Sequence, residues 1–301
     1  MPDFPDTLAK FCSARTAEQI LSSRRLRWSA PHLFCDPFEL THHTPLSFDP
    51  LTLLDGVIRS ATGMIFSRES PKSHSALATV IRRWREEERF ASPEEAEEVL
   101  KELMSRMVDQ RQVSLEELMA DWRKFTRELR ICCFSARADN LDSWQLFADH
   151  HRGVALRFRC GEYTALPEPK PVEYSPNRPE ITTFKEQINA ILHQEKVNAQ
   201  SRFLDKFLVK PPMSAEQQEW RCFYQATDHA SSREADENLW YDDRPFEKSD
   251  LASAYLGAFI STEDKQRVLR LVREEYPETK VFQAAPIPGK YEIEFHRVKG
   301  G

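Results

Sequence analysis

Residues 130–158 read RICCFSARADNLDSWQLFADHHRGVALRF, and this stretch decides the fold that the sequence predicts. The apolar run at 131–134 is typical of a buried strand. Gly153 ends a turn, and apolar residues then alternate over 154–158, which indicates a half-buried strand. The two strands and the segment between them form a compact unit that presents Ser135 at the end of its first strand.

A short helix is predicted between these two strands. Trp144, Phe147 and Ala148 recur at helical spacing, so they would form one buried face. Asp139 or Asp142 precedes that face, and aspartate is a residue type that caps helix N-termini. The stretch is therefore interpreted as strand, helix and strand.

Several short motifs in this stretch resemble a bacterial family catalogued as domain of unknown function 2971. C-F-S ends the first strand, D-N-L precedes the tryptophan, F-A-D-H follows it, and G-V begins the second strand. Further matches, in the order that the family has them, lie at 26–31, 34–39, 171–175, 219–221 and 255–257. The resemblance implies that residues 1–301 form one domain of this family, whose name assigns no activity.

Composition narrows the classes of protein that the chain can represent. Its 301 residues are enough for a large core, and its formal net charge is -6. No tail or block is uniformly basic, so nucleic-acid binding through the whole surface is not expected. The sequence contains no P-loop and no G-x-G-x-x-G motif. The six cysteines lack the spacing of zinc ligands, so no metal is expected.

The N-terminal residues indicate where the protein is expected to act. They read MPDFPD and lack the basic and then apolar build of a signal peptide. No apolar run approaches the length that crosses a bilayer. The expected location is therefore the cytoplasm, with reduced thiols and without membrane association.

The expected fold class is α+β, with a single strand-rich core, packed helices and a helical insert. The insert is predicted at 51–130, where apolar residues recur at helical spacing and Ser92 and Ser114 each begin a helix. A further long helix is predicted at 182–207. Short strands outside the central stretch are predicted at 8–12, 26–28, 219–225, 251–259, 281–283 and 291–295.

The candidate catalytic residues lie around the strand at 219–225. Glu219 follows Gln217 by two positions, which matches the [EQ]-x-E motif of ADP-ribosyltransferases. Lys10 on a first short strand and Ser135 at the end of a central strand complete an order that resembles the order in those enzymes. The resemblance implies an ADP-ribosyltransferase-like fold and an enzyme that consumes NAD.

The resemblance also implies a role for each residue. Cleavage of the nicotinamide–ribose bond develops positive charge on the ribose, and the Glu219 carboxylate would stabilise that charge. Ser135 would orient the carboxylate, and Gln217 would influence the choice of acceptor. Lys10 and Asp36 would shape the dinucleotide site, because a lysine meets a phosphate as a compact charge.

Two tryptophans are candidates for stacking on the rings of NAD. Trp28 and Trp144 offer the flat surfaces that such stacking needs, although most tryptophans with this spacing lie in a core. The expected acceptor is a protein or a nucleic acid. The expected biological context is bacterial conflict or phage defence.

Simpler interpretations of the same residues remain open. Glu219 is equally suited to a structural ion pair with Arg221, and Ser135 is equally suited to capping the helix that follows it. A second function is therefore a non-catalytic sensor or protein-interaction module, with 51–130 as its partner surface. A third is a nucleic-acid-processing enzyme.

Overall fold

The computed structural model describes residues 4–69, 71, 73, 75–226 and 236–298. The chain forms two compact units, and each contains segments that are distant in sequence. The first unit comprises residues 1–39, 126–178 and 207–301, and the second comprises 40–125 and 179–206. The second unit therefore includes a segment, 179–206, that the sequence analysis did not group with the insert.

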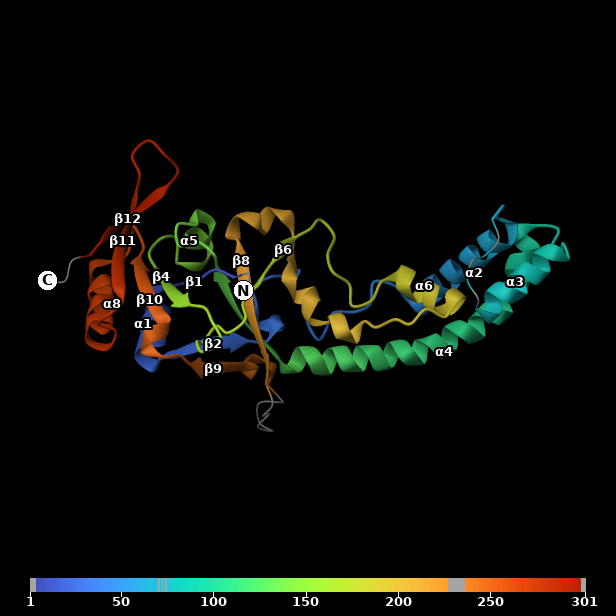
Figure 1. The fold of residues 1–301 in the computed structure, drawn as a ribbon, viewed down its shortest axis with the longest axis horizontal. Coiled ribbons are helices and arrows are strands. Elements are labelled where there is room, and N and C mark those ends of the chain that lie inside the picture. The colour runs from blue at the N-terminus through green and yellow to red at the C-terminus, as the bar shows by residue number, and fades with distance from the viewer. Residues whose placement is uncertain (1–3, 70, 72, 74, 227–235, 299–301) are drawn as a thin grey trace. The chain divides into compact units, whose positions relative to one another are not determined.

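The first unit is built on a ten-stranded sheet in which only β10 and β11 pair in parallel among the described strands (Figure 1). β8 (Glu219–Gln225) pairs with β3 and β5 (Lys170–Pro171). The main path of the sheet runs through β12 (Ile293–Arg297), β11 (Lys280–Pro286), β10 (Leu251–Leu256), β4 (Val154–Arg159), β1 (Thr7–Cys12), β3 (Leu129–Ser135), β2 (Arg25–Ser29) and β9 (Tyr241–Pro245).

Helices cover both faces of this sheet, which confirms the α+β class. On one face, α1 (Ala14–Ser23) and α8 (Thr262–Glu275) lie side by side (Figure 1). Their apolar residues pack with Leu8 and Leu156 in the main core. On the other face, α5 (Leu141–Phe147) contributes to a smaller core. Ser143, Leu146 and Phe147 of α5 line a cavity on this face.

The central stretch folds as strand, helix and strand, as predicted, with three differences. Trp144 and Ala148 are buried, but Phe147, predicted on the same buried face, is 49% exposed. The N-cap of α5 is Asn140, whose side chain accepts a hydrogen bond from the Ser143 N–H at 2.8 Å. The prediction of Asp139 or Asp142 was wrong. β4 is not half-buried, because it lies between β1 and β10 in the sheet interior, and Ala155 is buried like its neighbours.

The second unit contains α2 (Pro50–Phe66), α3 (Ala76–Glu86), most of α4 (Pro93–Glu128) and α6 (Phe184–His193). The predicted helix start at Ser114 was wrong, because the buried stripe of α4 continues in phase through Val108, Leu115 and Trp122. The helix predicted at 182–207 is shorter than expected. α6 ends at His193, and the next residue, Gln194, adopts a left-handed conformation with φ of 56°.

Short elements complete the described chain. β6 (Glu173–Tyr174) and β7 (Val209–Lys210) pair in parallel as a separate two-stranded sheet. The 3-10 helices are η1 (Pro31–Leu33), η2 (Gln200–Arg202), η3 (Leu204–Leu208), η4 (Pro212–Gln217), η5 (Glu237–Leu239) and η6 (Lys248–Asp250).

The turn between α5 and β4 is unusual because three consecutive residues have positive φ. The angles are 47° at Asp149, 51° at His150 and 67° at His151. Such conformations cost energy for non-glycine residues and persist where neighbouring contacts fix them. Backbone hydrogen bonds supply these contacts, from the Phe259 N–H to the His151 carbonyl and from the Gly257 N–H to the Gly153 carbonyl, both at 2.9 Å. A Cβ at position 257 would lie 2.2 Å from the His151 carbonyl oxygen. The turn and the end of β10 therefore require glycine at this contact.

We predict that Gly257→Ala lowers the free energy of unfolding by about 2 kcal/mol or more, because the methyl group would displace the backbone at His151. The measurement is urea denaturation of the intact chain. Gly63→Ala is the matched control, since a Cβ there meets nothing within 4 Å and alanine favours the helix by up to about 1 kcal/mol. Equal stability of Gly257→Ala and the wild type would contradict this account of the turn.

Candidate functional site

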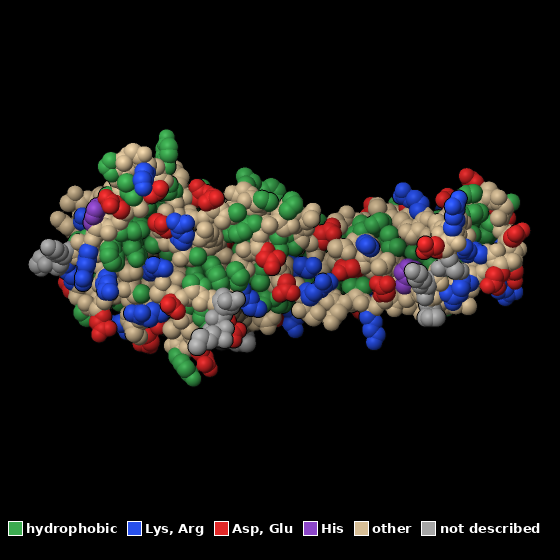
Figure 2. Space-filling model, turned by 45° about the horizontal axis from the view of Figure 1, so that its top comes forward, with side chains coloured by type: hydrophobic (Ala, Val, Ile, Leu, Met, Phe, Trp, Pro, Cys, Tyr) green, Lys and Arg blue, Asp and Glu red, His purple; other side chains and the backbone are tan. Residues whose placement is uncertain are grey.

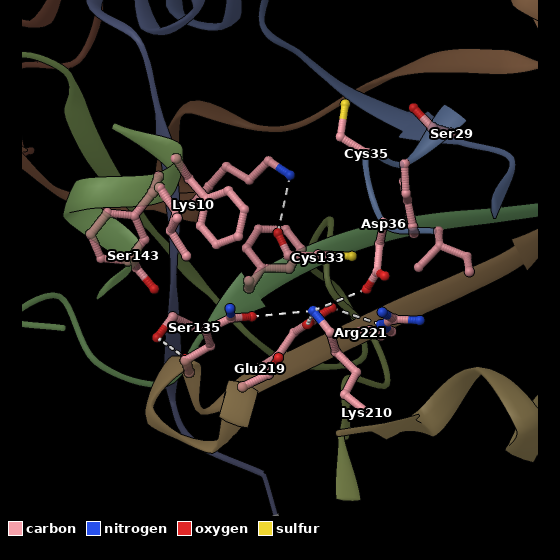
Figure 3. A pocket seen from close by; sticks show the side chains of 18 of the residues that line it. Lys10, Ser29, Cys35, Asp36, Cys133, Ser135, Ser143, Lys210, Glu219 and Arg221 are labelled. Carbon is pink, nitrogen blue, oxygen red and sulfur yellow. Dashed lines mark hydrogen bonds and ion pairs between the residues drawn. The ribbon is translucent and has the colours of Figure 1, made fainter. Parts of the chain in front are cut away.

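A cavity of about 650 Å³ opens in the first unit, on the side of the sheet that α5 covers only in part (Figure 3). β3 and β8 form one wall of the cavity. Their register places Cys133 opposite Arg221 and Ser135 opposite Glu219. Side chains at directly opposed positions share a face of an antiparallel sheet. The strand pairing thus assembles four polar side chains in one wall.

The sheet forks at the edge of β3 that borders the cavity. β3 pairs with β1 through Ala9 and Ser135, and with β2 through Ser29 and Ile131. Between these pairs, the Cys133 carbonyl accepts a hydrogen bond from the Lys10 ammonium at 3.0 Å. Lys10 therefore reaches the cavity, whose lining also includes Ser29 from β2.

Glu219 is nearly buried, with 9% of its side chain exposed, and both of its oxygens contact cations. Oε1 accepts a hydrogen bond from the Arg221 Nε at 2.7 Å, and Oε2 accepts one from the Lys210 Nζ at 2.9 Å. The backbone N–H of Glu219 donates to the Tyr174 hydroxyl at 2.8 Å. The pairing with Arg221 that the simpler interpretation predicted is confirmed, and the carboxylate is held by two cations while the backbone is held by Tyr174.

Arg221 extends this cluster to the loop after η1. Its Nη1 and Nη2 atoms donate to the two oxygens of Glu39 at 2.8 and 2.7 Å. Nη1 also donates to the Phe207 carbonyl at 2.8 Å. A bidentate arginine–carboxylate pair with further hydrogen bonds is the arrangement that makes a buried guanidinium tolerable.

The charges of Glu219 and Arg221 are fixed over the physiological pH range. Burial alone would raise the pKa of Glu219, but the nearby Arg221 and Lys210 lower it to about 2. Burial disfavours the charged form of Arg221, yet Glu219 and Glu39 hold its pKa well above the usual value. Burial also raises the pKa of the Cys133 thiol. Glu219 can therefore stabilise a cation but cannot donate a proton at neutral pH.

Lys210 connects three acceptors in the cavity wall. Its Nζ lies 2.9 Å from Glu219, donates to the Gln217 side-chain oxygen at 3.2 Å, and lies 4.0 Å from the Asp36 carboxylate (Figure 3). The other oxygen of Asp36 accepts the backbone N–H of Phe38 at 2.9 Å. The predicted residues Asp36, Gln217 and Glu219 thus converge on one lysine.

Ser135 lies beside Glu219 but has different partners. Its hydroxyl donates to the Gln217 carbonyl at 2.8 Å and accepts from the Arg137 N–H at 3.4 Å. Within the described part of the chain, these contacts hold the residues before β8 and do not reach the Glu219 carboxylate. Ser135 is not the cap of α5 either, because Asn140 takes that position.

Trp28 and Trp144 lie in the cores and are not among the residues that line the cavity. Trp144 has no exposed surface, donates its indole N–H to the Ala138 carbonyl at 2.7 Å and packs edge-on against Phe11. Trp28 packs edge-on against Tyr224. A stacking role requires an accessible ring face, so this part of the prediction is set aside in favour of the core interpretation.

Four residues of the cluster were not among the predicted site residues: Glu39, Tyr174, Lys210 and Arg221. Arg221 was considered only as a structural partner of Glu219. Glu39 ends the D-P-F-E segment, three positions after the predicted site residue Asp36. This closeness in sequence was the signal that could have identified Glu39. Lys210 and Tyr174 belong to strands of two residues, which are too short for a periodic pattern.

Comparison with known proteins found no matching family model, curated protein or solved structure. Over the described residues, no helix has both the length and the apolar character required to cross a bilayer.

We predict that Arg221→Lys lowers the free energy of unfolding by about 3 kcal/mol, because lysine cannot satisfy Glu39 and Glu219 together. Urea denaturation checks this value. Arg137→Lys is the matched control, since Arg137 makes an equivalent pair with Asp139 at the surface, where such pairs contribute up to about 1 kcal/mol. Similar losses in the two variants would show that the buried ion pairs of Arg221 contribute no more to stability than the surface pair of Arg137.

We also predict a specific pH dependence of stability. The pKa of Glu219 falls from 4.5 to about 2 on folding, which corresponds to about 3 kcal/mol of stability. Because the folded pKa is the lower one, this contribution is complete above pH 4.5 and is lost as pH falls towards 2. The stability difference between the wild type and Glu219→Gln should therefore shrink across this window. A constant difference in urea midpoints from pH 6 to pH 2.5 would contradict the assignment.

Proposed function

We propose that the first unit binds NAD in this cavity and cleaves the nicotinamide–ribose bond, as an ADP-ribosyltransferase-like enzyme of the family catalogued as domain of unknown function 2971. The observation that carries the proposal is the Glu219 carboxylate, which stays ionised and is fixed in the wall of a cavity beside a forked strand. A fixed anion stabilises positive charge better than a group that must reorient during the reaction.

The reaction follows from the charge on Glu219. As the bond between ribose C1′ and the nicotinamide nitrogen breaks, its electron pair leaves with nicotinamide and the ribose becomes an oxocarbenium ion. Glu219 lies where it can stabilise this ion and accept a hydrogen bond from a ribose hydroxyl, since a carboxylate has about four lone-pair sites. Arg221 and Lys210 occupy two of them. An acceptor nucleophile on a protein or nucleic acid then bonds to C1′ and loses its proton.

Lys10 supports the binding of the diphosphate. Its ammonium has three N–H donors, of which one is used by the Cys133 carbonyl and another interacts with the Cys132 sulfur. The ammonium lies 5.5 Å from the centroid of the Phe134 ring, a contact that favours the charged form. The remaining donor can bind an anionic oxygen in the cavity.

One observation favours a second candidate, a non-catalytic sensor or protein-interaction module. Both oxygens of Glu219 are already in ion pairs, as expected of a cluster that only supports the fold. A nucleic-acid-processing enzyme is less well supported. On the face shown in Figure 2, Lys and Arg side chains are interspersed with Asp and Glu side chains, whereas a nucleic-acid site concentrates positive charge.

We predict that Glu219→Gln lowers kcat for nicotinamide release about 100-fold or more, because the substitution keeps the shape and removes the charge. Nicotinamide release and NAD binding by calorimetry would be followed in the same samples, with urea midpoints to confirm folding. Glu275→Gln is the matched control, since Glu275 at the end of α8 pairs with Lys248 of η6 and is not among the residues that line the cavity.

Two results would decide between the candidates. Release of nicotinamide by the wild type and Glu275→Gln, with NAD bound but not cleaved by Glu219→Gln, supports the transferase. Failure of the wild type to bind NAD would leave the ion cluster as a structural feature and favour the interaction module.

A further inference from the structure

Glu219 is held by a small sheet that is separate from its own strand. β6 and β7 pair Tyr174 with Lys210, and both side chains reach Glu219. The Tyr174 hydroxyl accepts the backbone N–H, and the Lys210 ammonium donates to the carboxylate. The backbone and the side chain of Glu219 are therefore positioned by the same pair of residues.

The two cations on Glu219 differ in their freedom to move. Arg221 is 1% exposed, and its fork is fixed by Glu39 and by the Phe207 carbonyl. Lys210 has 13% of its side chain exposed and a flexible four-carbon stem. When a ligand needs an oxygen of Glu219, Lys210 is the cation that can yield it.

A second carboxylate is in place to receive the Lys210 ammonium. Asp36 lies 4.0 Å from Nζ, which is an ion-pair distance but too long for a hydrogen bond. Its other oxygen is fixed by the backbone N–H of Phe38. Gln217, 3.2 Å from the same Nζ, is a neutral acceptor that the ammonium can keep while it turns. The shift from Glu219 to Asp36 is thus short and keeps the ammonium paired throughout.

Such a shift would also favour the reaction electrostatically. With Lys210 and Arg221 both beside Glu219, two positive charges oppose the cation that develops on the ribose. Moving Lys210 to Asp36 removes one of them from the reacting carbon and leaves Glu219 with an oxygen for the ribose hydroxyl.

We infer that Lys210 is a positioning residue for Glu219, and that binding of NAD transfers its ammonium from Glu219 to Asp36. This inference rests on the proposed NAD-cleaving function. In the free protein Lys210 holds the Oε2 atom of Glu219 at 2.9 Å, and in the NAD complex it pairs with Asp36.

The test compares Asp36→Asn in two backgrounds, the wild type and Lys210→Met, by the rate of nicotinamide release against NAD concentration. In the wild type, Asp36→Asn removes the destination of the ammonium, so kcat/KM should fall about 10-fold. In Lys210→Met no ammonium competes for Glu219, so Asp36→Asn should change kcat/KM less than about 2-fold. The acid limb of the pH profile of kcat/KM should lie at higher pH in Lys210→Met, because one of the two cations that lower the Glu219 pKa in the free enzyme is gone.

Lys248→Met is the matched control, since it removes a lysine from the surface pair with Glu275 and should leave the rate unchanged. Urea midpoints monitor folding, and Lys210→Gln replaces Lys210→Met if the latter unfolds. Equal losses from Asp36→Asn in both backgrounds, or no loss in the wild-type background, would overturn the inference while the proposed function stands. A wild type that releases no nicotinamide would overturn both.

Discussion

The guanidinium of Arg221 is a charge in an almost fully buried position, and the structure around it is arranged to pair that charge. Removing such a group from water costs several kcal/mol unless every donor finds a partner. Here the partners come from three parts of the chain: Glu39, the Phe207 carbonyl and Glu219. The loop after η1, the segment before β7 and the start of β8 must therefore all be in place together.

This constraint also explains why one set of contacts suits both a structural and a chemical role. The contacts that make Arg221 tolerable also lower the pKa of Glu219 and fix its orientation. Catalysis requires a preorganised charge, and stability requires a paired one. A carboxylate in this cluster satisfies the structural requirement first, and it serves a reaction only if one oxygen becomes accessible to a ligand.

Local patterns predicted the elements that depend on local sequence. β3, α5 and β4 follow from apolar spacing over a few residues, and the α+β class follows from such patterns along the whole chain. Burial of β4 depends on neighbouring strands distant in sequence, so alternation alone described it incorrectly. In α4 a local signal was given too much weight. Ser114 resembles a helix cap, but the apolar stripe continues through this position and the helix is continuous.

The limits of local patterns also explain why the candidate site was predicted only in part. Glu219, Gln217, Lys10 and Asp36 line the cavity as the motif order suggested. The predicted role of Ser135 in orienting the carboxylate depended on side-chain direction, which a motif does not specify. The partners of Glu219 depend on pairing in strands of two residues, and no periodicity reveals these.

The sequence separation within the ion cluster has a consequence for biosynthesis. Glu39 and Arg221 are 182 residues apart in sequence. During translation Glu39 emerges long before its partner, so the cluster can close only after nearly three quarters of the chain has been made. Residues 40–125 and 179–206 of the second unit lie within that interval. Early folding of this unit would shorten the effective loop and lower the entropy cost of closing the cluster.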